Sequence, residues 1–367
     1  MSIELFPKKD NEKIVLYSLA KYPGLPDKDI SKILGIKVST FTSIKKRLKK
    51  DDYFKLILVP DLKYMGCEFL GVIFTSFNPI ISLEERLKIT KETIEVSDEI
   101  FLSIGDPEKG FSLSLNENYT NFVRINDKRT TTFGKEGLLE KEYPNEIIFP
   151  FPTSKTFEFF NYGKSLKKIF NIDNILNIPK ESEKAGEILE KKIKKFDFIE
   201  EKGNIKLKAN EKMVFLSLIN NPEATLQEIA DKIKLTRHTV SRIKKGFFEK
   251  GLLKYLTIPN LKKIGYGLLA FYHFKFSPQN PPTDEDFEQL NSDSTVYFVG
   301  KKFEALMISL YKDYDAYKID KTEKFTYLKL KELIIFDPEI RRYTFDRLVI
   351  IKDMVFEPIT EKILKNN

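Results

Sequence analysis

A chain of 367 residues is long enough for two to four compact domains, and its 41% hydrophobic content can bury several small cores. The single cysteine, Cys67, excludes an internal disulfide framework and disfavours a cysteine-based metal site. The first residues lack the apolar segment of a signal peptide, and no stretch approaches the ~18 apolar residues of a membrane span. We therefore expect a cytoplasmic protein without membrane contacts, bound metal or other cofactor.

The net charge of +8 is concentrated in two short segments, Lys37–Lys55 and Lys232–Lys254. The first contains seven positive and two negative residues, and the second contains eight positive and one negative. By subtraction, the rest of the chain is mildly acidic. Two matching basic patches of this kind are typical of a surface that binds nucleic acid.

The sequence contains an internal duplication. A shift of 199 residues aligns Glu12–Pro79 with Glu211–Pro278 without a gap, and 19 of the 68 aligned positions are identical. A second block, Phe101–Phe122, aligns with Val296–Tyr317 at a shift of 195, as one loop insertion or deletion would produce. A repeat found in this way sets the architecture, so the two copies are interpreted together.

Each copy begins with a predicted helix-turn-helix. In the first copy, apolar spacing predicts a helix from Asn11 to about Ala20, and a second over Asp27–Leu34 that opens after Pro26 and ends at Gly35. A third helix follows, with Ser39 as its N-cap and with Phe41, Ile44 and Leu48 on its buried face.

The second copy repeats this plan. Thr225 opens the first helix of its motif, Thr236 caps the next one, and the apolar face of that helix carries Val240, Ile243 and Phe247. After each third helix, an extended stretch, Tyr53–Val59 or Leu252–Ile258, is interpreted as the wing and strand of a winged domain.

The outward positions of the two third helices are the candidate DNA contacts, because hydroxyl, Lys and Arg side chains reach phosphates and base edges. They are Ser39, Thr40, Thr42, Ser43, Lys45, Lys46 and Lys49 in the first copy, and Thr236, Arg237, His238, Thr239, Ser241, Arg242, Lys244 and Lys245 in the second.

Beyond each wing, the pattern predicts a ferredoxin-like domain with the element order βαββαβ. In the first copy the elements are Phe69–Thr75, Ser82–Glu95, Ile100–Ile104, Phe111–Leu115, a helix starting over Tyr119–Asp127, and Glu146–Phe151. In the second they are Leu268–Phe276, Thr283–Leu290, Val296–Gly300, Ala305–Leu310, Tyr314–Thr326 and Leu333–Phe336. The charged stretch Glu181–Lys195 is interpreted as a connecting helix.

The predicted fold is therefore α+β, with two tandem modules. The expected boundaries are a winged helix-turn-helix over residues 1–60, a ferredoxin-like effector domain over 61–165, a helical linker over 166–208, a second winged helix-turn-helix over 209–259 and a second effector domain over 260–367.

The stretch LTRHTVSRIKKGFFEKGLL, Leu235–Leu253, resembles the recognition helix and wing of the Lrp/AsnC family of feast/famine regulators. The order of parts is also similar, with a P-x-L-x-x-x-G hinge at Pro60–Gly66 and Pro259–Gly265 ahead of a RAM-like βαββαβ domain. Members of that family carry one module and dimerise, whereas this chain carries two. The resemblance also leads us to expect an archaeal source.

The resemblance implies a DNA-binding transcription regulator whose effector domains pair within one chain, as a pseudo-dimer that reads an asymmetric or pseudo-palindromic site on double-stranded DNA. It further implies a small-molecule effector at the paired effector domains and allows larger homo-oligomers. A Gly-Asp turn of the family is matched by Gly105-Asp106 but not by Gly300-Lys301, so Gly105 and Asp106 are candidate effector contacts or a simple turn.

The interpretation at this stage is that the chain is not an enzyme and has no catalytic residues. The alternatives are a siroheme-decarboxylase-like enzyme, which resembles the same family in fold, and an architectural DNA-binding protein. The chain has two histidines, His238 on a recognition helix and His273 in a strand among aromatic residues, and neither effector half is basic. These features disfavour the decarboxylase, which needs proton-donating histidines and a basic pocket.

Overall fold

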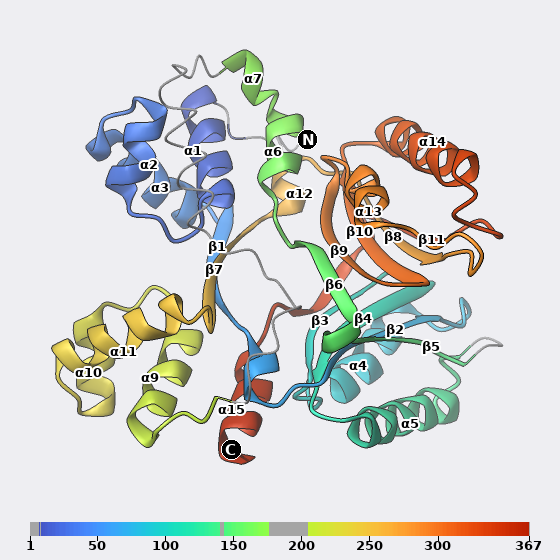
Figure 1. Cartoon of the computed structure of the whole chain (residues 1–367), viewed down its shortest axis with the longest axis horizontal. Helices are drawn as coiled ribbons and strands as arrows, with labels where there is room; N and C mark the ends of the chain where they lie inside the picture. Colours follow the sequence, from blue (N-terminus) through green and yellow to red (C-terminus); the bar gives the residue numbers. More distant parts are fainter. Residues whose placement is uncertain (1–6, 8, 140–142, 176–204, 367) are drawn as a thin grey trace. The chain divides into compact units, whose positions relative to one another are not determined.

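The computed structural model describes residues 7, 9–139, 143–175 and 205–366, and the helix expected at Glu181–Lys195 lies outside them. Two copies of one element order follow each other along the chain (Figure 1). None of the described helices is both long and apolar enough to cross a membrane.

The first helix-turn-helix consists of α1 (Asp10–Lys21), α2 (Asp27–Leu34) and α3 (Val38–Lys50). As predicted, α2 ends at Gly35, whose φ of 66° places it in the left-handed region that favours glycine. The predicted N-cap is wrong. The cap of α3 is Lys37, whose carbonyl accepts the Phe41 N–H at 3.0 Å, so Ser39 already lies within the first turn.

The second helix-turn-helix consists of α9 (Ala209–Asn220), α10 (Leu226–Ile233) and α11 (Arg237–Glu249). Here the predicted cap is confirmed, because the Thr236 hydroxyl accepts the Thr239 N–H at 3.2 Å. Val240 and Phe247 are buried against the other two helices, and Ile243 is half-buried.

The effector domain of the first repeat is a ferredoxin-like sheet covered by two helices. Its strands are β2 (Phe69–Ser76), β3 (Ile100–Gly105), β4 (Lys109–Asn116) and β5 (Asn145–Pro150), and its helices are α4 (Leu83–Ile94) and α5 (Tyr119–Lys135). The sheet has the order β12-β3-β4-β2-β5, in which four strands follow the predicted βαββαβ topology.

The second repeat builds the same sheet from β8 (Leu268–Lys275), β9 (Thr295–Lys301), β10 (Glu304–Tyr311) and β11 (Glu339–Thr344), with helices α13 (Asp284–Leu290) and α14 (Tyr314–Leu330). Its order is β11-β8-β10-β9-β6. Both sheets confirm the predicted α+β fold class.

The sequence pattern predicts the last strand of the second domain at Leu333–Phe336, and this prediction is wrong. Because α14 continues to Leu330, these residues form the connection, where Ile334 makes only an isolated bridge to Phe276 and Phe336 is 79% exposed. The strand that pairs with β8 is β11, which buries Tyr343.

The fifth strand of each sheet comes from the other repeat, which the sequence did not predict. Strand β6 (Ser154–Phe159) of the first repeat lies beside β9, and β12 (Val349–Asp353) of the second repeat pairs antiparallel with β3. Each exchanged strand covers an edge whose N–H and C=O groups would otherwise lack partners.

A helix follows each exchanged strand and packs on the helix-turn-helix of its own repeat. Helices α6 (Gly163–Phe170) and α7 (Ile172–Ile175) contact α1, and α15 (Glu357–Asn366) contacts α9. The hinges contain η1 (Leu62–Met65) and α12 (Leu261–Ile264), and a short helix η2 (Phe151–Thr153) precedes β6.

The chain divides into two compact units, and each unit combines parts of both repeats. One contains the first helix-turn-helix and the second effector domain, and the other contains the second helix-turn-helix and the first effector domain. The strands β1 (Phe54–Pro60) and β7 (Leu253–Pro259) form a two-stranded sheet, and part of each strand belongs to each unit.

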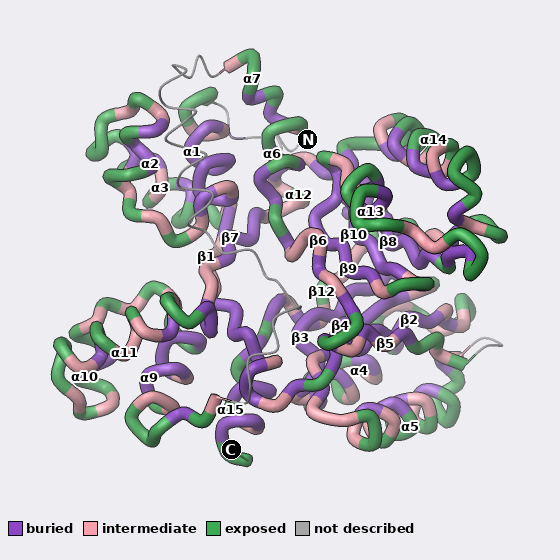
Figure 2. The backbone as a smooth tube through the Cα atoms, in the orientation of Figure 1, coloured by how far each residue is buried: buried purple, intermediate pink, exposed green. Residues whose placement is uncertain are grey.

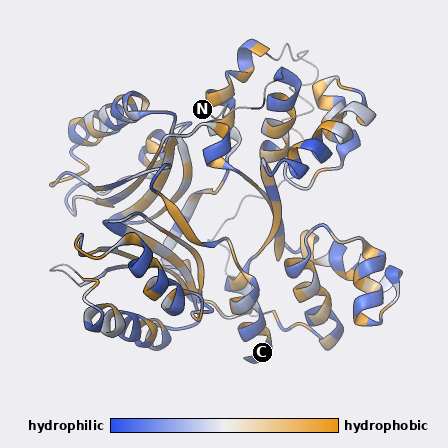
Figure 3. Cartoon of the chain, turned by 180° about the vertical axis from the view of Figure 1, so that it is seen from behind, coloured by the Kyte–Doolittle hydropathy of each residue, from blue (hydrophilic) through white to orange (hydrophobic). Residues whose placement is uncertain are grey.

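Burial follows the sheets. Strands β2, β3, β8 and β10 are almost entirely buried, whereas α5 and α14 expose one side (Figure 2). The strands are correspondingly hydrophobic, and the helices that cover them alternate between hydrophobic and hydrophilic residues (Figure 3).

One buried carboxyl group stands at the first hinge. Asp61 is 6% exposed, and burial raises its pKa to about 6 although Lys63 and Lys254 lower it. The equivalent residue of the second repeat is Asn260, whose side chain caps α12 by accepting the Lys263 N–H.

We predict that Asp61→Asn stabilises the protein at neutral pH. Because the folded-state pKa of Asp61 lies above the ordinary value of 3.8, the stability present at low pH is lost as the pH rises from about 4 through about 6. At pH 8 the free energy of unfolding should therefore be higher for the variant than for the wild type. About 3 kcal/mol is the upper bound, since one pKa unit corresponds to about 1.4 kcal/mol and the substitution also removes the carboxylate 3.8 Å from the buried Lys63 Nζ. Urea unfolding at pH 4 is the control, where equal midpoints are expected. A variant that is less stable at pH 8 would contradict the prediction.

Candidate nucleic-acid interface and a buried arginine cavity

Helix α11, the third helix of the second helix-turn-helix, presents an exposed basic face. Arg237, His238, Ser241, Arg242 and Lys245 are all exposed, and their spacing of three and four residues places them along one side of the helix. Within the described part of the chain, the side chains of Arg237 and Arg242 make no hydrogen bond or ion pair. Lys245 has only a long contact with the exposed Glu249, 3.6 Å away on the same helix. This face is therefore available to an anionic partner.

Arg242 also lies in a groove between α11 and the start of α9. Lys208, Lys250 and the N-terminal residues Ala209 and Asn210 line the same groove, with Glu211 as its one acidic residue. The backbone N–H groups at a helix N-terminus favour anions, and three cationic side chains around them strengthen that preference.

The equivalent helix of the first repeat, α3, is partly neutralised. Lys45 Nζ lies 2.7 Å from Asp27 Oδ1, and Thr42 Oγ1 donates to Asp27 Oδ2 at 2.9 Å. Arg47 pairs with Glu12 of α1. The second repeat has Leu226 at the position of Asp27, so this carboxylate has no counterpart there.

The remaining candidates differ in exposure. Ser39, Thr40, Ser43, Lys46 and Lys49 are exposed on α3. In the second repeat, Thr236 and Thr239 are held by the helix cap, and Lys244 is half-buried. The structure thus separates Thr42 and Lys45, which are bound to α2, from the exposed residues.

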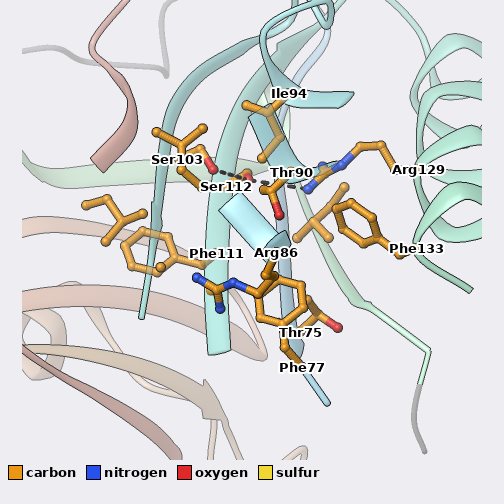
Figure 4. A pocket seen from close by; sticks show the side chains of 15 residues that line it. Thr75, Phe77, Arg86, Thr90, Ile94, Ser103, Phe111, Ser112, Arg129 and Phe133 are labelled. Carbon is orange, nitrogen blue, oxygen red and sulfur yellow. Dashed lines mark hydrogen bonds between the residues drawn. The ribbon is translucent and has the colours of Figure 1, made fainter. Parts of the chain in front are cut away.

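A second feature lies inside the effector domain of the first repeat. A cavity between the sheet and helices α4 and α5 is lined by the guanidinium groups of Arg86 and Arg129 and by the hydroxyls of Thr75, Thr90, Ser103 and Ser112 (Figure 4). None of the lining residues, all of them described, is Asp or Glu. The volume of the cavity is about 20 Å³.

The two arginines are deeply buried, with exposures of 1% for Arg86 and 7% for Arg129. The Arg86 guanidinium lies over the Phe77 ring, 4.4 Å from its centroid, and Arg129 Nη2 lies 3.5 Å from Ser112 Oγ. The Nε and Nη1 atoms of Arg129 have no hydrogen-bond partner among the described residues. Burial lowers the pKa of Arg129 to about 10, and the exposed Glu146 partly offsets this effect, so the group stays charged at neutral pH.

The two effector-domain candidates from the sequence have different surroundings. Gly105 lines the cavity, and a Cβ atom at this position would lie 3.3 Å from Arg86 Nη2. Asp106 Oδ1 instead accepts the N–H groups of Glu108 and Lys109, both at 2.9 Å, and so closes the turn between β3 and β4.

The sequence analysis missed the cavity, although a signal was present. The buried stripe of α5 consists of Phe122, Asn126, Arg129 and Phe133, so two polar residues stand where apolar residues were expected. Arg86 likewise shares the buried side of α4 with Thr90 and Ile94.

Other reactive side chains are enclosed. His273 is buried and its Nε2 lies 2.7 Å from Glu304 Oε1, and burial raises the pKa of the Cys67 thiol. Within the described residues, no group of three or more His, Cys, Asp or Glu is placed to hold a metal ion.

No protein-family model and no curated protein sequence matches the chain. Among solved structures, the siroheme decarboxylase NirDL matches 98% of this chain and 99% of its own, with a TM-score of 0.52 and 10% identity. A structure of the same enzyme with an iron-uroporphyrin III analogue gives the same TM-score and coverage at 9% identity. This chain shares its fold with an enzyme. From the sequence, we expect that the chain is not an enzyme. The full-length match to an enzyme contradicts this expectation.

Single-module regulators match a smaller part of the chain. AsnC of E. coli covers 38% of this chain and 93% of its own, with 14% identity and a TM-score of 0.32. The transcriptional regulator NMB0573 from Neisseria meningitidis, solved with L-Met, covers the same share of this chain at 16% identity and a TM-score of 0.29.

We predict that Asp27→Asn strengthens the binding of duplex DNA. The substitution removes the carboxylate that holds Lys45, so one more cation reaches a phosphate. The slope of log K against log salt should then become steeper by about 0.9 for that one additional contact. Fluorescence anisotropy with a random-sequence duplex over a salt series measures it.

The matched control is Asp29→Asn. Asp29 is exposed in the first turn of the same helix, so this variant changes the net charge and the helix terminus equally without touching Lys45. Equal slopes for the two variants would show that Lys45 is not a phosphate contact.

Proposed function

We propose that this protein is a sequence-specific, DNA-binding transcription regulator that reads DNA chiefly with α11. The observation that supports this most strongly is the exposed face of Arg237, His238, Ser241, Arg242 and Lys245, whose two arginines have no internal partner in the described structure. A helix with such a face fits the major groove, and arginine is the side chain best suited to guanine.

The groove beside Arg242 supports the same proposal. A DNA phosphate at the N-terminus of α9 would meet backbone N–H groups together with Lys208 and Lys250. Phosphate contacts of this type fix the position of the recognition helix on the duplex, while Arg242 and Arg237 extend toward the bases.

The differences between α3 and α11 favour an asymmetric DNA site. The exposed set on α3 is mostly small hydroxyls with Lys46 and Lys49, whereas α11 carries two exposed arginines that have no partner among the described residues. Helix α11 then reads one half-site through base contacts, and α3 binds the other half-site mainly through the DNA backbone.

The decisive experiment is selection of bound fragments from genomic DNA, followed by binding titrations across a salt series. Selective enrichment with a steep salt slope supports the regulator. Equal affinity for all fragments would instead indicate an architectural DNA-binding protein, and absence of binding at low salt would rule out both.

We predict that Arg242→Ala costs about 1–3 kcal/mol of affinity for the selected site and relaxes the preference at one base pair. The guanidinium is exposed and its removal leaves no buried group unpaired, so the folded protein should keep its stability. Anisotropy titrations with the selected site and its single-base variants measure the effect.

Arg47→Ala is the matched control, because Arg47 of α3 is exposed but paired with Glu12 on α1. Its effect should be small and independent of sequence. If Arg242→Ala weakened every sequence equally, Arg242 would be a phosphate contact and the base reader would lie elsewhere.

A second candidate is an enzyme that acts on the carboxylate groups of a tetrapyrrole. The match to the decarboxylase NirDL over nearly the whole of both chains favours it. The enzyme candidate lacks an obvious histidine to donate a proton, because His273 is buried against Glu304 and His238 lies on α11.

Absorption titration of the purified full-length protein with iron-uroporphyrin III tests this candidate directly. A saturable shift of the porphyrin absorption band with one or two sites per chain supports it, whereas no shift at micromolar protein rejects it. The DNA titrations run in parallel, so the two candidates give separate readouts.

A further inference from the structure

Four polar side chains that line the arginine cavity are replaced by apolar ones at the equivalent, described positions of the second domain. At the positions of Thr75, Ser103 and Ser112, the second repeat has Phe274, Phe298 and Met307. All three are buried in the apolar core of that domain. The fold itself therefore does not require polar side chains at these positions, and their presence in the first domain needs another explanation.

Arg86 shows the same contrast. Helices α4 and α13 begin at the N-caps Ser82 and Thr283, which places Phe287 at the position of Arg86. The two side chains face equivalent glycines, since a Cβ on Gly105 would lie 3.3 Å from Arg86 Nη2 and one on Gly300 would lie 2.9 Å from the Phe287 ring.

The surrounding contacts agree. Arg86 lies over the ring of Phe77, and Phe287 packs edge-on against the equivalent Phe276, with ring centroids 5.4 Å apart. An aromatic ring of the second domain thus occupies the space that a guanidinium group occupies in the first domain.

Arg129 has a cationic counterpart, but one that is neutralised inside the domain. Helices α5 and α14 have equal lengths, and the equivalent residue is Lys324. Lys324 forms a buried ion pair with Asp320 and also donates to Ser292 Oγ at 2.7 Å. Asp320 in turn accepts a hydrogen bond from the Tyr311 hydroxyl at 2.5 Å. Residue 125, at the position of Asp320, is isoleucine, so Arg129 has no such partner on its own helix.

Burying a charged guanidinium without a partner is costly, because its hydration is lost without compensation. In the described structure, Arg129 leaves Nε and Nη1 without hydrogen bonds, and Thr90 Oγ1 is also unpaired at the cavity wall. Each unpaired guanidinium N–H can donate a charge-assisted hydrogen bond to an oxygen of a carboxylate or another oxyanion.

We propose that the cavity between the sheet and helices α4 and α5 of the first effector domain binds one small oxyanion, held by Arg86 and Arg129 and by the surrounding hydroxyls. At about 20 Å³ the cavity as it stands has room for little more than one water-sized group, so acetate or inorganic phosphate enters only when the surrounding side chains move apart, and an aromatic or macrocyclic body is excluded. The site does not depend on the DNA-binding proposal.

The test is equilibrium dialysis of the full-length protein with radiolabelled acetate and, separately, radiolabelled phosphate, at fixed ionic strength set by chloride. We expect saturation at one anion per chain for at least one of the two, because the second domain lacks the site. Binding of neither anion, or a stoichiometry of two, would overturn the proposal.

Variants locate the site. Arg129→Gln should weaken anion binding at least tenfold, because a charge-assisted hydrogen bond is worth about 1.5–3 kcal/mol. Arg86→Phe, which introduces the residue of the second domain, should do the same and is compatible with the fold there. The matched control is Arg124→Gln on the exposed side of α5, which should bind like the wild type.

Circular dichroism and the Tm without anion establish that each variant is folded. In the wild type, saturating anion should raise the Tm by several degrees, since a ligand that binds only the folded state stabilises it. Folded Arg129→Gln and Arg86→Phe variants that keep wild-type affinity would place the anion elsewhere and refute the assignment.

Discussion

The hydrogen bonding of two sheet edges is the constraint on which the fold depends. Strands β3 and β9 form one edge of the four strands that their own repeat contributes, and in each case the strand that covers this edge is supplied by the other repeat. A helix continues from each exchanged strand onto the helix-turn-helix of its own repeat, with α6 on α1 and α15 on α9. Edge pairing therefore links the helix-turn-helix of one repeat to the ferredoxin-like domain of the other within each compact unit.

On this duplicated scaffold, the two halves have diverged in their charged groups more than in their backbone. In the first repeat, Asp27 neutralises Lys45 of α3, whereas α11 keeps its arginines exposed. In the effector domains the difference is reversed, because the first domain buries Arg86 and Arg129 and the second closes Lys324 with Asp320. One half thus carries the cationic surface and the other carries the cationic interior, an arrangement that two identical subunits could not have.

Local patterns in the sequence predicted most helices and strands, but they did not predict which strands pair across long distances in the chain. Gly35 and Thr236 mark helix ends through backbone conformation and side-chain capping, so α2 and α11 were placed closely. Strand β12 has only five residues, and its partner β3 lies more than 200 residues earlier, so no local pattern indicated the exchange. The outward positions of α3 and α11 followed from helical periodicity, but the Asp27–Lys45 pair and the cavity of Arg129 depend on contacts between elements, which periodicity does not specify.

The exchange of β12 has a consequence for synthesis on the ribosome. The edge of β3 ends at Gly105, and its partner begins at Val349, close to the C-terminus. At about 5–20 residues per second, the ribosome needs roughly 12 to 50 s to make the intervening chain, and during this time the first sheet has an uncovered edge. Such an edge can pair with other nascent chains. The first effector domain is thus begun early and completed last, which makes the newly made chain most vulnerable to aggregation at the domain that carries the arginine cavity.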